Sequence, residues 1–154
     1  MPVSSVRRQS RRLLVSALLS QASAKPHAYT VQDQVALRRL LAFKVSPDGS
    51  RIAYTLRTTD LEANKGLIDL WLINADGSNP RQLTSDPGPD SDPTFSPDGK
   101  SIFFLSARGG SSQVWKLSLE GGEPTQVTKS PIDIDSYTMS RDGSMIAFAA
   151  ETFV

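Results

Sequence analysis

Short runs in which apolar and polar residues alternate recur along most of the chain, separated by residues that form turns. One set of runs reads FKV, RIAYTL, DLWLIN and PRQLT, and a later set reads PTF, SIFFLS, QVWKLSL and PTQVT. Alternation with a period of two residues is typical of half-buried strands, and neither set has the period of roughly 3.6 residues that marks a helix. Each set therefore predicts four short antiparallel strands.

One turn sequence occurs three times, at the junction of the first and second predicted strands. It reads VSPDGSRIAY at 45–54, FSPDGKSIFF at 95–104 and MSRDGSMIAF at 139–148. In Ser-Pro-Asp-Gly, Pro presets φ for the second turn position, Asp tolerates the third, and Gly closes the turn. Arg141 replaces Pro in the third copy, which a type I turn accepts.

The spacing of the copies is regular. Ser96 and Ser140 are 44 residues apart, as are Trp71 and Trp115. Ser46 precedes Ser96 by 50 residues, and the six additional residues fall within the polar stretch TTDLEANKG. A fixed period of about 40–50 residues is the signature of a repeat architecture. Because strand side chains alternate, the two tryptophans lie on equivalent faces, and we expect both to pack between repeats rather than bind a ligand.

The repeated units predict an all-β fold of β-propeller blades, each a sheet of four antiparallel strands. A β-sandwich would not repeat the same turn and the same Trp in register. The predicted blades cover residues 42–85 and 92–129, with the start of a third at 135–154. Propellers close with about 4–8 blades, so about two and a half blades predict an incomplete propeller from a longer protein, or an assembly of several chains.

A linker and a short helix are predicted at residues 25–41, ahead of the first blade. Thr30 followed by Asp33 resembles a capping box, which marks a helix start. The apolar positions that follow give a loosely amphipathic helix, expected to pack against the edge of the propeller. These positions are Val35, Ala36, Leu40 and Leu41.

Residues 1–24 have the order of a secretory signal peptide, with cleavage after Ala24. Four arginines (Arg7, Arg8, Arg11 and Arg12) precede the apolar run LLVSALL and the small-residue stretch QASA. This order predicts a secreted or periplasmic protein, and SRRLL faintly resembles a twin-arginine signal. Two alternatives remain. The stretch is rich in Arg and Ser and lacks acidic residues, as mitochondrial presequences do, and a disordered basic tail would also fit.

Composition excludes several classes of function. Seventeen basic against sixteen acidic residues leave no field that would favour a nucleic-acid partner. The chain has no cysteine, which excludes disulfides and thiolate metal sites, and no apolar run approaches the roughly 20 residues of a membrane span. The only histidine, His27, falls in the linker, so a Ser-His-Asp triad is not expected. No nucleophile elbow, phosphate loop or dinucleotide fingerprint occurs, so neither a catalytic residue nor a cofactor is predicted.

Several charged residues in the predicted turns and strands have a structural interpretation. Asp86, Asp90 and Asp92 lack the spacing of an EF-hand loop and read as turn formers, so no metal is predicted. Asp133 and Asp135 alternate with isoleucines, as on the outer face of a strand. Arg108 in SARGG reads as a solvated hairpin tip.

The cassette SPDG…W…G…P.QLT resembles the propeller repeat shared by TolB-like proteins and the prolyl oligopeptidase family of serine peptidases, and WD-repeat and kelch signatures are absent. The opening YTVQDQVALRRLLAFKV resembles the start of the acylaminoacyl-peptidase and dipeptidyl-peptidase branch, in which a T-x-x-D helix leads into the first blade. A D-x-x-x-x-x-G connection also precedes DLWL. In TolB-like proteins a separate α/β domain usually comes first, for which about 20 residues leave no room.

The resemblance to the peptidase branch implies a propeller of seven blades that caps a C-terminal α/β-hydrolase domain. That domain would carry the Ser, Asp and His and would be the propeller's partner, while the propeller restricts entry to small peptide substrates. Propeller glutamates bind the substrate amino group in some dipeptidyl peptidases, but no matching motif surrounds Glu62, Glu120 or Glu123. The alternatives are a TolB-like periplasmic protein-binding propeller and a truncated gene product that does not fold stably.

Overall fold

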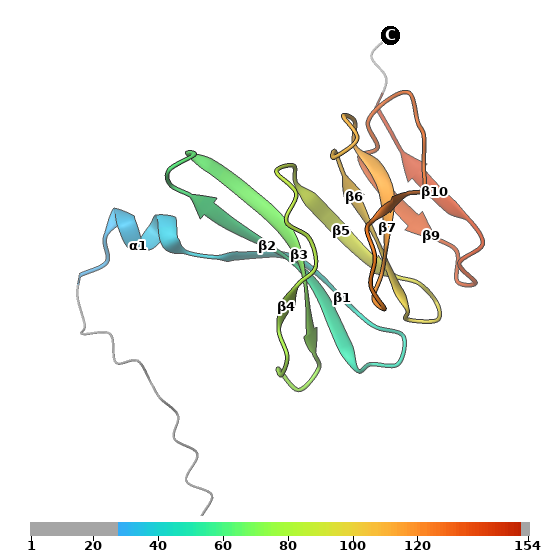
Figure 1. Cartoon of the computed structure of the whole chain (residues 1–154), viewed down its shortest axis with the longest axis horizontal. Coiled ribbons are helices and arrows are strands. Elements are labelled where there is room, and N and C mark those ends of the chain that lie inside the picture. Colours follow the sequence, from blue (N-terminus) through green and yellow to red (C-terminus); the bar gives the residue numbers. More distant parts are fainter. Residues whose placement is uncertain (1–27, 152–154) are drawn as a thin grey trace, which may run out of the picture.

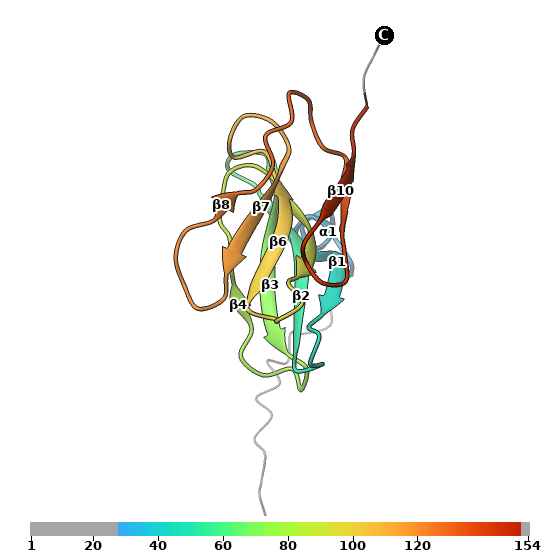
Figure 2. The ribbon, with the colours of Figure 1, turned by 90° about the vertical axis from the view of Figure 1, so that its right-hand side faces the viewer.

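The computed structural model describes residues 28–151. The predicted signal peptide and His27 lie outside the described residues. Two antiparallel sheets of four strands and one of two strands lie in a row, face to face, with a short helix beside the first sheet (Figures 1 and 2). The predicted all-β fold of propeller blades is confirmed.

Each complete blade has its strands in sequence order. The first blade contains β1 (Arg39–Val45), β2 (Arg51–Asp60), β3 (Lys65–Asn74) and β4 (Arg81–Gln82). The second contains β5 (Asp90–Phe95), β6 (Ser101–Ser106), β7 (Gln113–Ser118) and β8 (Thr125–Gln126). The third sheet pairs β9 (Ser136–Met139) with β10 (Ile146–Ala149). Trp71 pairs with Gln82 and Trp115 with Gln126, so the two tryptophans are equivalent in register, as predicted.

The helix α1 (Val31–Ala36) begins as predicted but ends earlier. Thr30 and Asp33 form both halves of the capping box. The expectation that Leu40 and Leu41 continue the helix is wrong, because both lie in β1. Leu37 is already extended, and pairing with β2 from Arg39 onward satisfies backbone groups that a longer helix would otherwise bond internally.

The repeated turn uses the same hydrogen bonds in every copy. The Ser46 hydroxyl donates to Asp48 Oδ1 at 2.6 Å and accepts from the Arg51 amide at 2.9 Å. The serines of the other two copies repeat both contacts. Gly49, Gly99 and Gly143 have φ of 73°, 69° and 74°, a conformation that favours glycine.

The six additional residues of the first repeat lengthen the β2–β3 hairpin. Strands β2 and β3 each have ten residues, whereas β6 and β7 each have six. The Asp60 carboxylate accepts from the amides of Glu62 and Ala63, both at 3.0 Å, and so closes the hairpin tip. The predicted position of the insertion is confirmed.

The main hydrophobic core lies between the first and second blades. Strand β5 packs across β1, β2 and β3 (Figure 1). The buried members of this core come from both sheets: Ala53, Leu70 and Leu72 from the first, and Phe95, Ile102, Phe104 and Leu117 from the second. The two sheets therefore bury their facing apolar residues against each other.

A second, smaller core joins the second blade to β9 and β10. Leu105 and Val114 pack there against Ile134 and Tyr137. The Tyr137 hydroxyl donates to the Asp92 carbonyl at 3.0 Å, and burial raises the pKa of this phenol.

The expectation that Asp133 and Asp135 lie on a strand is wrong, since β9 begins at Ser136. Asp133 Oδ1 accepts from the Ser112 amide at 2.7 Å, while Ile134 is 2% exposed. Asp135 Oδ2 accepts from the Glu151 amide at 3.1 Å. These bonds hold Asp133 against the second blade and Asp135 against Glu151, so the segment does not continue β9.

The two tryptophans occupy different environments despite their equal register. Trp115 packs against the core between the blades, as predicted. Trp71 lies on the other face of its blade, because it alternates with the buried Leu70 and Leu72, and it stacks on Tyr54 with ring centroids 6.4 Å apart. Packing of Trp71 between two blades is therefore not seen among the described residues.

We expect Trp115→Ala to destabilise the chain by about 2–4 kcal/mol, because it opens a cavity between the blades. Trp71→Ala should cost about 1 kcal/mol in the monomer, because that ring contacts one blade only. Urea unfolding followed by circular dichroism measures both changes. Equal losses for the two variants would contradict the assignment of Trp71 to an uncovered face.

Candidate binding site between the first two blades

Arg108 follows β6 and turns back into the protein. The interpretation of Arg108 as a solvated tip is wrong, because its side chain is only 14% exposed. Its Nη2 donates to Asp90 Oδ2 at 2.7 Å, and its Nε donates to the Ser106 hydroxyl at 2.9 Å. Asp90 is fully buried, so the guanidinium neutralises a charge that would otherwise be costly in the core.

Two aromatic rings also position the guanidinium. The Arg108 Cζ lies 5.1 Å from the centroid of the Phe104 ring and 5.4 Å from that of Trp115, both within the range of a cation–π contact. Trp115 Nε1 donates to the carbonyl of Ser106 at 3.2 Å. Arg108 is thus held by an ion pair, a hydroxyl and two rings, which fixes its orientation.

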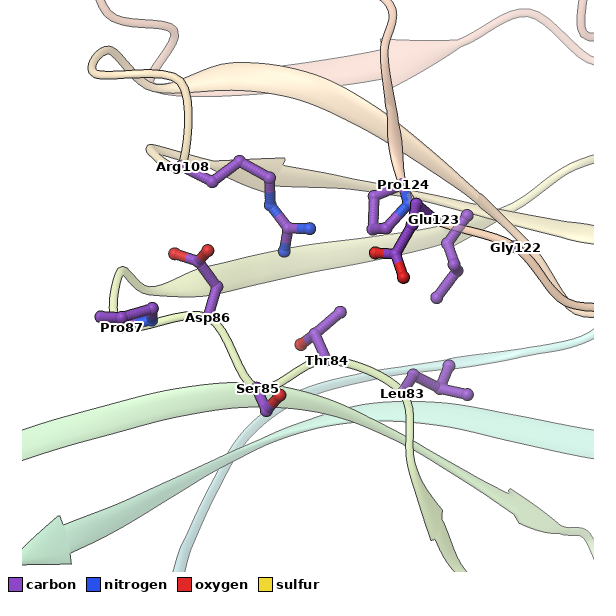
Figure 3. Close-up of a pocket in the computed structure, with 10 residues that line it drawn as sticks. Leu83, Thr84, Ser85, Asp86, Pro87, Arg108, Gly122, Glu123 and Pro124 are labelled. Atoms are coloured by element: carbon purple, nitrogen blue, oxygen red, sulfur yellow. The ribbon is translucent and has the colours of Figure 1, made fainter.

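A cavity of about 360 Å³ lies beside Arg108, between the first and second blades. Residues 83–87, which leave β4, form one wall, and residues 122–124, which precede β8, form another. Figure 3 shows the side chains of Asp86 and Glu123 directed toward the same space as the guanidinium. The walls therefore combine carboxylates with one arginine that is already paired with Asp90.

Two carboxylates close to this cavity are buried and incompletely hydrogen-bonded. Asp69 is 6% exposed and Asp90 is 0% exposed, and the Oδ1 atom of each lacks a hydrogen-bond partner among the described residues. Burial raises the pKa of Asp69, and the neighbouring charge of Asp90 raises it further. The Gln82 side chain donates to Asp69 and opposes this shift.

The second blade places an amide where the first has Asp69. Gln113 stands 44 residues after Asp69 and is 1% exposed. Its Nε2 donates to the carbonyls of Ser130 and Ile132 at 3.1 and 3.2 Å, and its Oε1 accepts from the Thr128 hydroxyl at 3.0 Å. A carboxylate cannot donate to the corresponding carbonyls unless it is protonated, so the connection that leaves the first blade lacks these bonds.

The interpretation of Asp90 as a turn former is wrong, because it begins β5, is fully buried and pairs with Arg108. Asp86 Oδ1 accepts from the Gly88 amide at 2.9 Å, which confirms its interpretation as a turn former. Asp92 has φ of 50° at an irregularity in the β5–β6 pairing. Between residues 28 and 151, no group of three or more metal-ligating side chains is placed to hold an ion.

The carboxylates and the arginine in the walls of this cavity suit the binding of a polar partner. No histidine lies in the described part of the chain, so no imidazole base is placed near a serine there. Over the same residues, no helix is long and apolar enough to cross a membrane.

The ion pair of Asp90 with Arg108 was not predicted from the sequence, since the two residues are 18 residues apart with no shared motif. The difference between Asp69 and Gln113 was readable from the 44-residue period.

The chain matches the family described as the TolB beta propeller domain over residues 32–153. This match covers most of the chain and agrees with the four-stranded blades and their repeated turn. The chain therefore belongs to the TolB beta propeller domain family.

Both peptidases and TolB proteins are among its relatives. Over 106 residues, or 64% of the chain, it is 29% identical to dipeptidyl-peptidase 5 of Porphyromonas gingivalis. Over 50 residues, or 32% of the chain, it is 54% identical to the Tol-Pal system protein TolB of Anaeromyxobacter dehalogenans. The chain spans only 16% of the length of the first relative and 10% of the second.

Solved structures of both kinds share the fold. An acylaminoacyl peptidase of Pyrococcus horikoshii superposes with a TM-score of 0.60 at 23% identity, covering 73% of this chain and 17% of the peptidase. A putative TolB from Agrobacterium tumefaciens gives a TM-score of 0.57 at 25% identity, covering 72% of this chain and 39% of that protein. The blades are thus similar to propellers of both kinds.

We expect Asp69→Asn to stabilise the chain increasingly as pH rises from about 4 to 7. The pKa of Asp69 is higher in the folded chain than the value of 3.8 expected in the unfolded chain, so folding favours the protonated carboxyl. The stability that this protonated form contributes to the chain is complete below pH 3.8 and is lost as the pH rises through the folded-state pKa. Asn cannot ionise and avoids this loss, which should raise the melting temperature at pH 7 by about 2–4 °C.

Asp76→Asn is the matched control for this pH dependence. Ser78 holds the pKa of Asp76 below its usual value, so the contribution of this carboxylate is present above pH 3.8 and is lost in acid. The control should therefore lose stability at neutral pH. Melting curves with the same pH dependence for both variants would contradict the assignment.

We expect Arg108→Ala to destabilise the chain by about 3–5 kcal/mol, because it leaves Asp90 buried and unpaired. Adding Asp90→Asn to that variant should restore part of the loss. Lys100→Ala serves as the control, since the pair of Lys100 with Glu120 is exposed at 3.9 Å and should contribute less than about 1 kcal/mol. Denaturant unfolding measures these losses of stability. If the losses for Arg108→Ala and Asp90→Asn simply add in the double variant, this would argue against the ion pair.

Proposed function

We propose that the chain is the N-terminal propeller portion of a serine exopeptidase of the acylaminoacyl-peptidase or dipeptidyl-peptidase type. In this proposal the blades restrict the access of peptides to a hydrolase domain supplied by the rest of the polypeptide. The observation that carries the proposal is the length of the similarity to dipeptidyl-peptidase 5, which extends over 106 residues and so exceeds two repeats of 44.

The opening of the chain supports the same proposal. The capped helix α1 leads within three residues into β1 and contacts β2, which matches the T-x-x-D opening that resembles the peptidase branch. The D-x-x-x-x-x-G connection forms the elongated β2–β3 hairpin, closed by the Asp60 carboxylate. A cavity of about 310 Å³ separates α1 from this hairpin. A helix and hairpin that project together from the first blade offer a contact surface for a neighbouring domain.

A TolB-like binding propeller is the second candidate. The local identity of 54% to the Anaeromyxobacter protein favours it, although it extends over 50 residues only. In this case the acidic cavity beside Arg108 would contact a protein partner, and no hydrolase domain would be present. We also propose export of the protein to the periplasm or the exterior, based on the charged, apolar and small residues of 1–24.

Antibodies raised against residues 28–151 can isolate the native polypeptide from its source. We expect a protein several times longer than 154 residues that reacts with a fluorophosphonate probe for serine hydrolases and begins at Lys25. The isolated 154-residue chain should leave aminoacyl and acyl-aminoacyl chromogenic substrates intact.

Prior inhibition of the precipitate with an unlabelled fluorophosphonate controls for nonspecific labelling. A native polypeptide that the probe does not label would contradict the peptidase and favour the binding propeller. An intact Met1 on the mature protein would count against export.

A further inference from the structure

The first blade has an apolar face that no described residue covers. Cross-strand pairing places Phe43, Tyr54 and Trp71 in one row and Val45, Ile52 and Ile73 in another. These rows alternate with Ala53, Leu70 and Leu72, which pack on the second blade, so they face the opposite way. Phe43 is 61% exposed and Val45 is 52% exposed. This set of six residues is called the open face.

The repeat identifies the open face as an interface between blades. Five of its six members correspond, at offsets of 50 or 44 residues, to positions of the second blade that pack on the first. The corresponding pairs are Val45 and Phe95, Ile52 and Ile102, Tyr54 and Phe104, Trp71 and Trp115, and Ile73 and Leu117. In the second blade, four of these positions are at most 8% exposed, and Trp115 packs against the same core. The open face therefore has the chemistry of a surface that another blade covers.

The other end of the row carries the complementary surface. On β9 and β10, the side chains that face away from the second blade are exposed: Ser136, Thr138, Ala147 and Ala149. Ala147 and Ala149 correspond to Ala53 and Thr55, which receive the second blade and are 0% and 1% exposed. We call this set of four the back face. Small residues there leave room for large ones, as they do between the first two blades.

We propose that, in the 154-residue chain, the open face binds the back face of a second copy. The contact repeats between copies the packing of the second blade on the first. It joins two different surfaces, so the association is head to tail, and further copies can add at either end. The proposal rests on the blade repeat and not on the proposed peptidase function.

The absence of cysteine permits a direct test of which faces meet. Phe43→Cys marks the open face on β1, and Thr138→Cys marks the back face on β9. We expect a short bismaleimide to link the two variants when they are mixed, while neither variant links to itself. Thr125→Cys on the outermost strand β8 is the control and should link to neither. Links between two open faces would overturn the head-to-tail arrangement.

Light scattering over a range of concentrations tests whether the open face drives association. Phe43→Lys should shift the association to at least ~10-fold higher concentration, because a charge would be buried at the contact. Leu61→Lys is the control, because it also introduces a lysine but at a residue that is 68% exposed on the hairpin tip. This variant should associate like the unmodified chain. A chain that stays monomeric at every concentration would contradict the proposal and leave the open face to a blade of a longer polypeptide.

Discussion

The apolar contact between the sheets of consecutive blades is the interaction on which the rest of the structure depends. A blade is a sheet with two apolar faces, so it cannot bury both of them by itself. Leu70 and Leu72 of the first blade meet Ile102 and Phe104 of the second, and all four are nearly or fully buried. Stacking also brings the turns of the first two blades together, since Arg51 Nη2 donates to the carbonyl of Gly99 in the next turn at 2.8 Å.

Stacking also determines where charge is buried. Buried polar side chains lie next to the connections between blades, and they need partners within the protein. The second blade meets this need with the amide of Gln113, whereas the first has the carboxylate of Asp69 beside the ion pair of Asp90 with Arg108. The cavity between the first two blades takes its charge from Arg108, Asp86 and Glu123 in its walls, which makes it the candidate site for a polar partner.

The sequence predicted the blades because their signals are local or periodic. Turn residues and alternation define each strand, and the 44-residue spacing brings equivalent strands into register. Features decided by tertiary contacts were not predicted. The side chain of Arg108 turns inward because a buried carboxylate lies there, and Leu41 joins a strand because β2 is available to pair. The equivalence of Asp69 and Gln113 follows from the repeat period, but the burial of Asp69 does not.

Hydrogen–deuterium exchange of individual backbone amides tests most directly whether blade stacking stabilises the chain. Strands β6 and β7 have a sheet on each face, β2 and β3 on one face only, and β10 ends a two-stranded sheet. Under conditions that keep the chain monomeric, we expect the slowest exchange in β6 and β7, faster exchange in β2 and β3, and the fastest in β10. Equal protection in both complete blades, or stronger protection in the first, would show that each blade is stable by itself and would contradict this account.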